Sequence, residues 1–375
     1  MIDFFQEYQL VIIILAGIFL AIQLFYLIVY LSRFAFYKPK QEGANQPPVS
    51  VVICARNELE NLQKFLPLVL QQQYPNYEVV LVNDCSWDGS YDYLKELALQ
   101  YPILRVADIK EVEGREHGKK FALTIGIKAA RYEVLLLTDA DCYPQSEYWI
   151  SEMMRAYRNQ TQIVLGYGKF EKASGFLNYV VRWENFFNAA MYFSRTLWGK
   201  PYMGVGRNLS YKKSNFFAQK GFAAHMHINS GDDDLFIQAV AKGDNTQICV
   251  SKNAHTITLA KTTWKEWFRQ KKRHNSTAKY YKSSDKAYLW LYPLSLLCFY
   301  AFAALLLILQ IEVLITISVI FLRALLQIFI LHTIGKKLDE RMQPWLAPIN
   351  ELIMYLFIYP SYKLATFRLR KNKWK

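Results

Sequence analysis

The chain has 375 residues, of which 53% are hydrophobic and 16% aromatic, and it carries a net charge of +14. This length allows one large domain or two ordinary ones, and the apolar, aromatic-rich composition argues against a purely soluble enzyme. The five cysteines are odd in number and include no CxxC pair, which argues against both a disulfide framework and a zinc site.

The N-terminal stretch is apolar. Leu10–Leu31 comprises 22 residues without a charge, and a helix needs about 20 apolar residues to cross a hydrocarbon core. Residues 1–37 therefore predict a transmembrane anchor. A cleaved signal peptide is the competing interpretation, but the charges that precede the stretch are the acidic Asp3 and Glu7. The basic residues that follow predict an outside N-terminus and a cytosolic domain; they are Arg33, Lys38 and Lys40.

A Pro-rich linker over residues 38–48 precedes an alternation of strands and helices. Apolar strands are predicted at 49–55, 77–84, 103–109 and 132–141, and helices at 58–73, 88–100 and 118–130. Because the strands are apolar on both faces, they predict a parallel sheet that helices cover on both sides. We therefore expect an α/β domain over residues 49–287.

Polar residues gather at the carboxyl ends of these strands, where such sheets bind ligands. They are Arg56, Asn57, Glu58, Asn83, Asp84, Asp139 and Asp141. Asp139 and Asp141 point the same way in an extended segment, so both can face one divalent cation or a ribose hydroxyl. A solvated turn is the alternative, but Mg²⁺ or Mn²⁺ with a diphosphate better explains two acids at a sheet edge. Lys119, at the start of the preceding helix, either supplies charge to a phosphate or caps a solvated turn.

Three adjacent acids, Asp232, Asp233 and Asp234, precede a helical pattern. Acids are favoured at helix N-termini, so capping is one interpretation. One cap does not need three carboxylates, and their mutual repulsion raises at least one pKa toward that of a useful general base. The residues alone leave capping and catalysis open.

Further apolar blocks follow. Residues 288–335 are too long for one span and predict a transmembrane helical hairpin that turns near residues 310–312. Residues 336–375 contain a basic cytosolic loop, an apolar block at 346–364 and a basic tail. Two prolines, an Asn and a Glu within that block favour an interfacial or re-entrant segment over a full span. Before the hairpin, Lys261–Lys286 carries a net charge of +7, which suits nucleic acid, a membrane surface or an active site.

Seven segments with recognisable motifs follow one another along the chain: VSVVICARNE, LVNDCSWDGS, GKKFALTIGIKAA, VLLLTDADCYP, GVGRNLSYKK, SGDDDLF and QKKRH. In order and spacing they resemble the membrane-bound family 2 glycosyltransferases, a group that contains polysaccharide synthases and ceramide-glucosyltransferase-like enzymes. The resemblance covers Val49–His274. It implies a GT-A fold, a nucleotide-sugar donor of the UDP-sugar type, a Mg²⁺ or Mn²⁺ ion and inverting transfer.

The resemblance also implies roles for single residues. Asp233 or Asp232 would be the catalytic base, with Asp233 favoured, and Gly206 and Asn208 would shape the donor-sugar and acceptor side. The metal ligands would be Asp141 and Asp139. The nucleotide and the donor would be bound by Ala55, Glu58, Asp84, Lys119, Asp139, Gln270 and Arg273. His274 replaces the Trp of the family's QxxRW motif.

The expected acceptor is a membrane lipid or a lipid-linked glycan. The aromatic segment at 176–198 suits the headgroup level, although a buried helix of the domain is the alternative. Few spans favour single-sugar addition over a processive polysaccharide synthase. We expect a bacterial inner-membrane protein with a cytoplasmic catalytic domain and no nucleic-acid partner. A basic membrane-bound binding or scaffold protein is the non-enzyme alternative, and it does not explain acids at several strand ends.

Overall fold

The computed structural model describes residues 8–39, 46–110, 118–158, 160–228, 230–340 and 342–368. The acidic start of the chain, most of the predicted linker and the basic tail at 369–375 lie outside these ranges. The chain forms two compact units. One contains the described residues up to Lys38 together with Tyr281–Arg368, and the other runs from Pro39 to Tyr280.

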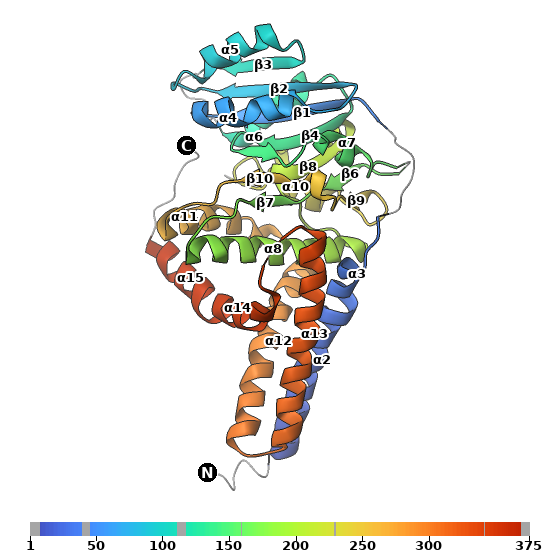
Figure 1. Cartoon of the computed structure of the whole chain (residues 1–375), viewed down its shortest axis with the longest axis vertical. Coiled ribbons are helices and arrows are strands. Elements are labelled where there is room, and N and C mark those ends of the chain that lie inside the picture. The colour runs from blue at the N-terminus through green and yellow to red at the C-terminus, as the bar shows by residue number, and fades with distance from the viewer. Residues whose placement is uncertain are drawn as a thin grey trace. The chain divides into compact units, whose positions relative to one another are not determined.

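The first unit contains long apolar helices. The N-terminal one comprises α2 (Gln9–Phe25), a π-helical turn (Tyr26–Leu31) and α3 (Ser32–Ala35). α12 (Ser283–Ile308) and α13 (Val313–Lys337) follow, and the chain reverses between them where Gln310 and Glu312 have positive φ. In the described part of the chain, these three stretches are long and apolar enough to cross a membrane. They run side by side (Figure 1).

A buried polar cluster joins the last segment of this unit to the three long helices. That segment comprises a 3-10 turn (Pro344–Leu346), α14 (Ala347–Ile353), a π-helical turn (Met354–Ile358) and α15 (Tyr359–Arg368). Arg323 of α13 donates to Glu351 of α14 at 3.2 Å and to Gln23 of α2 at 2.7 Å. Tyr292 of α12 donates to Glu351. Because the Arg323 and Glu351 side chains are 0% and 1% exposed, this ion pair fixes α14 against α13 from inside the unit.

The second unit is built on a seven-stranded sheet of order β3-β2-β1-β4-β8-β6-β9. β1 (Val49–Ala55), β2 (Tyr77–Asp84), β3 (Leu104–Ile109) and β4 (Val134–Asp139) are parallel, as the sequence predicts. β8 (Leu209–Lys212) pairs antiparallel with both β4 and β6 (Ile163–Leu165), and β9 (Thr246–Ile248) lies beside β6. The sheet is therefore mixed, because the regular alternation of strands and crossover helices stops after β4.

Helices pack on both faces of the parallel half. Alternate residues of β1 point to opposite faces. Val51 packs in a core with α4 (Leu59–Leu70) and α5 (Ser90–Gln100). Val52 faces α6 (Lys119–Ala129), where a Cβ on Gly126 would lie 2.7 Å from Val52 and 2.9 Å from Val82. A glycine at this position lets α6 approach the sheet.

The remaining elements surround the far half of the sheet. β5 (Cys142–Pro144), β10 (Thr256–Thr258) and β7 (Gly168–Phe170) form a three-stranded sheet. The helices are α7 (Trp149–Met154), α8 (Phe176–Leu197), α9 (Lys213–Ala218), α10 (Asp234–Val240) and α11 (Trp264–Asn275). Most side chains of α8 are buried, which favours a helix of the domain core over a helix at the headgroup level.

Candidate active site

The carboxyl ends of β1, β2 and β4 meet at one edge of the sheet. Ala55 lies opposite Asn83, and Cys54 lies opposite Asp139. A pocket opens at this edge and takes its lining from five segments of the chain. The polar and small residues that line it are Cys54, Lys119, Thr138, Asp139, Gly206, Asp232 and Asp233. The parallel register therefore brings together residues that are far apart in the sequence.

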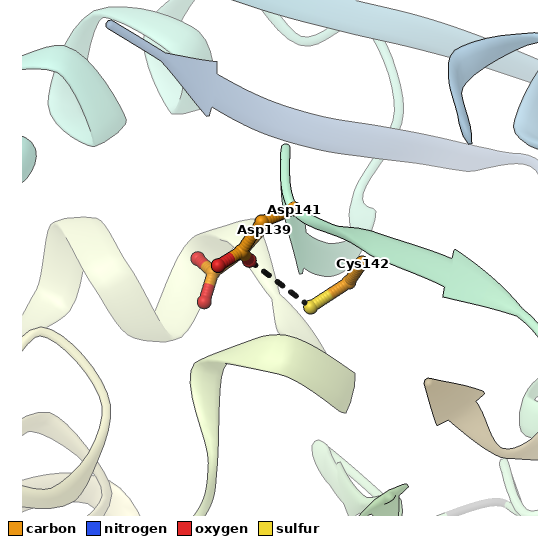
Figure 2. Close-up of side chains that lie close together, drawn as sticks. All are labelled: Asp139, Asp141 and Cys142. Atoms are coloured by element: carbon orange, nitrogen blue, oxygen red, sulfur yellow. Dashed lines mark hydrogen bonds between the residues drawn. The ribbon is translucent and has the colours of Figure 1, made fainter. Parts of the chain in front are cut away.

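Asp139 ends β4, Asp141 lies two residues later, and Cys142 lies beside them (Figure 2). One ligand atom from each of the three lies within 4.8 Å of the others. The Cys142 thiol donates to Asp141 at 3.4 Å. Burial raises the pKa of Asp141, and the neighbouring Asp139 carboxylate raises it further. Two crowded carboxylates are a donor set that fits Mg²⁺ or Mn²⁺, and a cation would relieve their repulsion.

Lys119 links two acidic groups of the pocket. Its ammonium group lies 2.8 Å from Asp139 and 3.0 Å from Asp232. Although burial alone would lower its pKa, these two carboxylates hold the pKa of Lys119 well above its ordinary value. The lysine that opens α6 is thus a charged group inside the pocket and not a solvated cap.

The three acids of SGDDDLF have different surroundings. Asp232 faces Lys119. Asp233 accepts hydrogen bonds from the backbone N–H of Gly206 at 2.9 Å and of Asp234 at 2.8 Å. Asp234 accepts from the backbone N–H of Leu235 at 2.7 Å and from the Thr277 hydroxyl. Asp233 is also the N-cap of α10, so capping and a place in the pocket fall on the same residue.

These surroundings move two pKa values apart. Burial raises the pKa of Asp233 to about 7, and the charges of Asp232 and Asp234 act in the same direction. Burial alone would also raise the pKa of Asp232, but Lys119 and Arg273 outweigh it and lower that pKa below its usual value. Two neighbouring carboxyls with separated pKa values allow one to accept a proton near neutral pH while the other stays ionised.

The loops after β1 and β2 are bound to each other and form one wall of the edge. Asn57 accepts from the backbone N–H of Trp87 at 3.0 Å, and Asp88 accepts from that of Leu59 at 2.9 Å. Among the predicted nucleotide ligands, Asp84 is completely buried at the end of β2 and Ala55 is buried at the end of β1. Burial raises the pKa of Glu58, which is the N-cap residue before α4 and accepts from Asn61 at 2.6 Å.

Gly206 and Asn208 occupy different places. The backbone of Gly206 lines the pocket beside Asp233. Asn208 is fully buried, and its side chain donates to the carbonyls of Tyr167 and Ala254 at 3.0 and 2.7 Å and accepts from Trp149 at 3.0 Å. The Asn208 side chain therefore holds the loops behind the pocket together.

Helix α11 carries the motif QKKRH. Arg273 is exposed, and its charge contributes to the low pKa of Asp232. Gln270 is half-buried one turn earlier on the helix. Lys271 forms a 2.8 Å ion pair with Glu184 of α8 and is 15% exposed. Of the basic residues in 261–286, Lys271 therefore does not add its charge to an exposed surface, because Glu184 pairs with it inside the unit.

Sequence reasoning missed several residues around the pocket. Lys120 donates to the carbonyls of His225 and Ile228 at 2.6 and 3.0 Å, and burial lowers its pKa to about 8. Asp88 and Thr277 bind neighbouring loops in a similar way. Each contact joins residues that are distant in the chain, so spacing alone gives no sign of it.

Comparisons with known proteins agree with this geometry. Residues 50–222 match the family described as "Glycosyl transferase family 2". The chain is 34% identical over 104 residues to Glycosyltransferase AglE of Haloferax volcanii. The aligned region covers 27% of this chain and 33% of that protein. It is 33% identical over 119 residues to the dolichol-phosphate mannosyltransferase of Pyrococcus furiosus, and the aligned region covers 32% of each protein. The chain spans about a third of the length of these relatives.

A solved structure shares the fold. The mannosyltransferase PcManGT from Pyrobaculum calidifontis, in complex with GDP-Man and Mn²⁺, superposes with a TM-score of 0.57 at 16% sequence identity. The match covers 92% of this chain and 99% of that chain. The α/β class and the GT-A fold expected from the sequence are confirmed.

Proposed function

Because this chain is a family 2 glycosyltransferase through residues 50–222, we propose that it moves a sugar from a nucleotide-sugar to a membrane-associated acceptor, with inversion at the anomeric carbon. One observation carries the proposal. A single pocket at the carboxyl edge of the sheet holds the Asp139 carboxylate and the charged Lys119 beside an acid, Asp233, whose pKa is about 7.

The donor would bind at this edge. Asp84, Ala55 and Glu58 would surround the nucleoside, which we propose to be uridine. Asp139 and Asp141 would hold a Mg²⁺ or Mn²⁺ ion, which would offset the negative charge of the diphosphate. Their crowding and the raised pKa of Asp141 support this role. The similarity in fold to a mannosyltransferase in complex with Mn²⁺ supports it too.

Asp233 would act as the base. Its carboxylate would take the proton of the acceptor hydroxyl while that oxygen attacks the anomeric carbon. The bond from the anomeric carbon to the diphosphate oxygen would break, and the nucleoside diphosphate would leave with the electron pair. Lys119 and Arg273 would stabilise the developing negative charge. Asp232, held ionised by Lys119, would keep that lysine in place.

The acceptor would be a lipid or a lipid-linked glycan. Three helices able to cross a membrane support a membrane-bound enzyme. With basic residues flanking them, we propose that the catalytic unit faces the cytoplasm of a bacterial cell. Transfer of a single sugar is favoured over processive synthesis. The second possibility draws support from 33% identity over 106 residues to the poly-beta-1,6-N-acetyl-D-glucosamine synthase of Staphylococcus epidermidis.

The proposal is tested with the full chain purified in detergent and supplied with membrane lipid extract and Mn²⁺. A panel of UDP- and GDP-sugars is added one at a time, and the products are analysed by mass spectrometry. We expect one nucleotide-sugar to give a lipid heavier by one sugar residue. A ladder of products would favour the polysaccharide synthase. Tight, salt-sensitive nucleic-acid binding without turnover of any nucleotide-sugar would favour a binding protein.

A further inference from the structure

Helix α11 is held at its N-terminal end by an aromatic contact with α8. Phe176, the first residue of α8, and Trp264, the first residue of α11, have ring centroids 6.2 Å apart. Trp264 also meets Trp267 edge-on, with centroids 5.6 Å apart. Trp267 is 2% exposed. This contact fixes only one end of a helix that is 12 residues long.

A buried ion pair holds the middle of the helix. Lys271 Nζ lies 2.8 Å from Glu184 Oε1, and the Glu184 side chain is 5% exposed. Glu184 lies eight residues after Phe176 on α8, and Lys271 lies seven residues after Trp264 on α11. The aromatic contact and the ion pair are therefore separated by about two helical turns on each helix. Buried ion pairs add little net stability compared with apolar packing, but the loss of one partner is costly. Such a pair therefore specifies one position of the helix.

The C-terminal end of α11 is joined to the acidic segment. Thr277 follows the helix and is 1% exposed. Its hydroxyl donates to the Asp234 carboxylate and also lies 2.8 Å from the carbonyl of His274. A hydroxyl has one proton, and the charged carboxylate is the stronger acceptor. The backbone N–H of Asp234 donates to Asp233 at 2.8 Å, so this contact connects α11 to the base in one step.

We propose that Thr277 and the Lys271–Glu184 pair are positioning residues, which hold Gln270 and Arg273 of α11 at a fixed place relative to Asp233. This inference rests on the proposed function and extends it. It gives the third acid of SGDDDLF a separate role, because Asp234 attaches the helix while Asp232 and Asp233 face the pocket. None of the three positioning side chains lines the pocket itself.

The first test replaces Thr277 by Val, which keeps the shape of the side chain and removes the hydroxyl. We expect kcat for sugar transfer to fall at least about tenfold, because the base and Arg273 lose their common attachment. The affinity for the nucleoside alone should change by less than about twofold, since the strand ends proposed to bind it are untouched, whereas Gln270 and Arg273 of α11 are proposed to contact the diphosphate. Thr277→Ser should restore transfer. Ser276→Ala removes the exposed neighbouring hydroxyl, which bonds the Arg273 carbonyl at 2.7 Å, and should behave as wild type.

A second measurement does not depend on activity. Hydrogen exchange of the α11 amides in the intact protein should become faster in Thr277→Val and in Glu184→Gln, while exchange in β1 and β2 stays unchanged. Lys271→Met combined with Glu184→Leu should restore slow exchange, because no buried charge is left alone.

The outcomes separate this inference from the proposed function. If wild-type protein transfers sugar and Thr277→Val matches it in both kcat and exchange, the positioning role is contradicted. The role is also contradicted if exchange rises throughout the unit and the affinity for the nucleoside alone falls in step with kcat, because that is general destabilisation. If wild-type protein turns over no nucleotide-sugar while α11 still loosens in the variants, the attachment stands and the proposed function fails.

Discussion

The acids of the pocket are distinguished by their neighbours and not by their type. Asp232 and Asp233 are adjacent carboxyls, yet Lys119 lowers the pKa of one while burial raises that of the other to about 7. The sequence predicted that an acid in this run would have a raised pKa and favoured Asp233. It could not show why the two pKa values differ, because Lys119 lies more than a hundred residues earlier in the chain. Only the fold brings Lys119 next to Asp232, whose pKa it lowers.

Replacing each acid by Asn separates their roles. Asp233→Asn should lower kcat by about 10²- to 10⁴-fold, because the acceptor hydroxyl loses its base. Asp232→Asn should cost about tenfold, because it removes only a partner of Lys119. Steady-state transfer rates of the two purified variants give the comparison. Equal and mild losses would mean that neither residue is the base.

The pH dependence follows from the raised pKa of Asp233. The base acts when it is ionised, so kcat/KM should rise by about tenfold per pH unit below pH 7 and level off above it. Asp232→Asn removes a negative charge beside Asp233 and should move the midpoint to lower pH. The profile is recorded for wild type and variant under the same ionic strength. A midpoint that moves upward in the variant would rule out this electrostatic account.

At the scale of the elements, the close packing of α6 on the sheet positions Lys119. A Cβ at Gly126 would lie under 3 Å from side chains of both Val52 and Val82. Gly126→Ala gains about 1 kcal/mol of helix propensity but overpacks the interface by about 1–3 kcal/mol. We expect a net loss, seen as a lower Tm in detergent. Gly17→Ala, where a Cβ would meet no atom within 4 Å, serves as the control; an equal or higher Tm for Gly126→Ala would contradict the argument.

The strands near the pocket follow from the sequence, whereas the strands of the far half do not. The predicted strand at 49–55 is β1 with the same bounds, because its residues alternate between two apolar layers. β6 and β9 have three residues each, too few for a pattern, and β8 enters the sheet antiparallel. The contacts of Asn208, Lys120 and Thr277 join residues that are distant in the chain, so spacing alone does not reveal these contacts.

At the scale of the whole molecule, the polar cluster in the unit of long helices is the feature that composition hides. In the sequence, Arg323 and Glu351 each interrupt an apolar block, and only the fold shows that they form an ion pair. Charged groups within membrane segments are expensive unless paired. The pair explains how a segment containing Glu351 can pack against α13.

Replacing only one partner of the Arg323–Glu351 pair should destabilise the protein more than replacing both partners by apolar residues. Glu351→Leu leaves the Arg323 guanidinium buried without its anion and should cost about 3–5 kcal/mol. The double variant Arg323→Met with Glu351→Leu should recover part of that loss. Thermal unfolding in one detergent compares the three proteins. A double variant less stable than Glu351→Leu alone would show that the pair does not act as a unit.

Turnover of a nucleotide-sugar by the full chain, compared with Asp141→Asn, tests the central claim most directly. With Mn²⁺, membrane lipids and the sugar panel, wild-type protein should release nucleoside diphosphate and form an equal amount of glycosylated lipid. Asp141→Asn should remain folded, by its Tm, and form no product, because one of the two carboxylates proposed to hold the cation is lost. Full activity in Asp141→Asn, or no turnover of any sugar by wild type, would contradict the account.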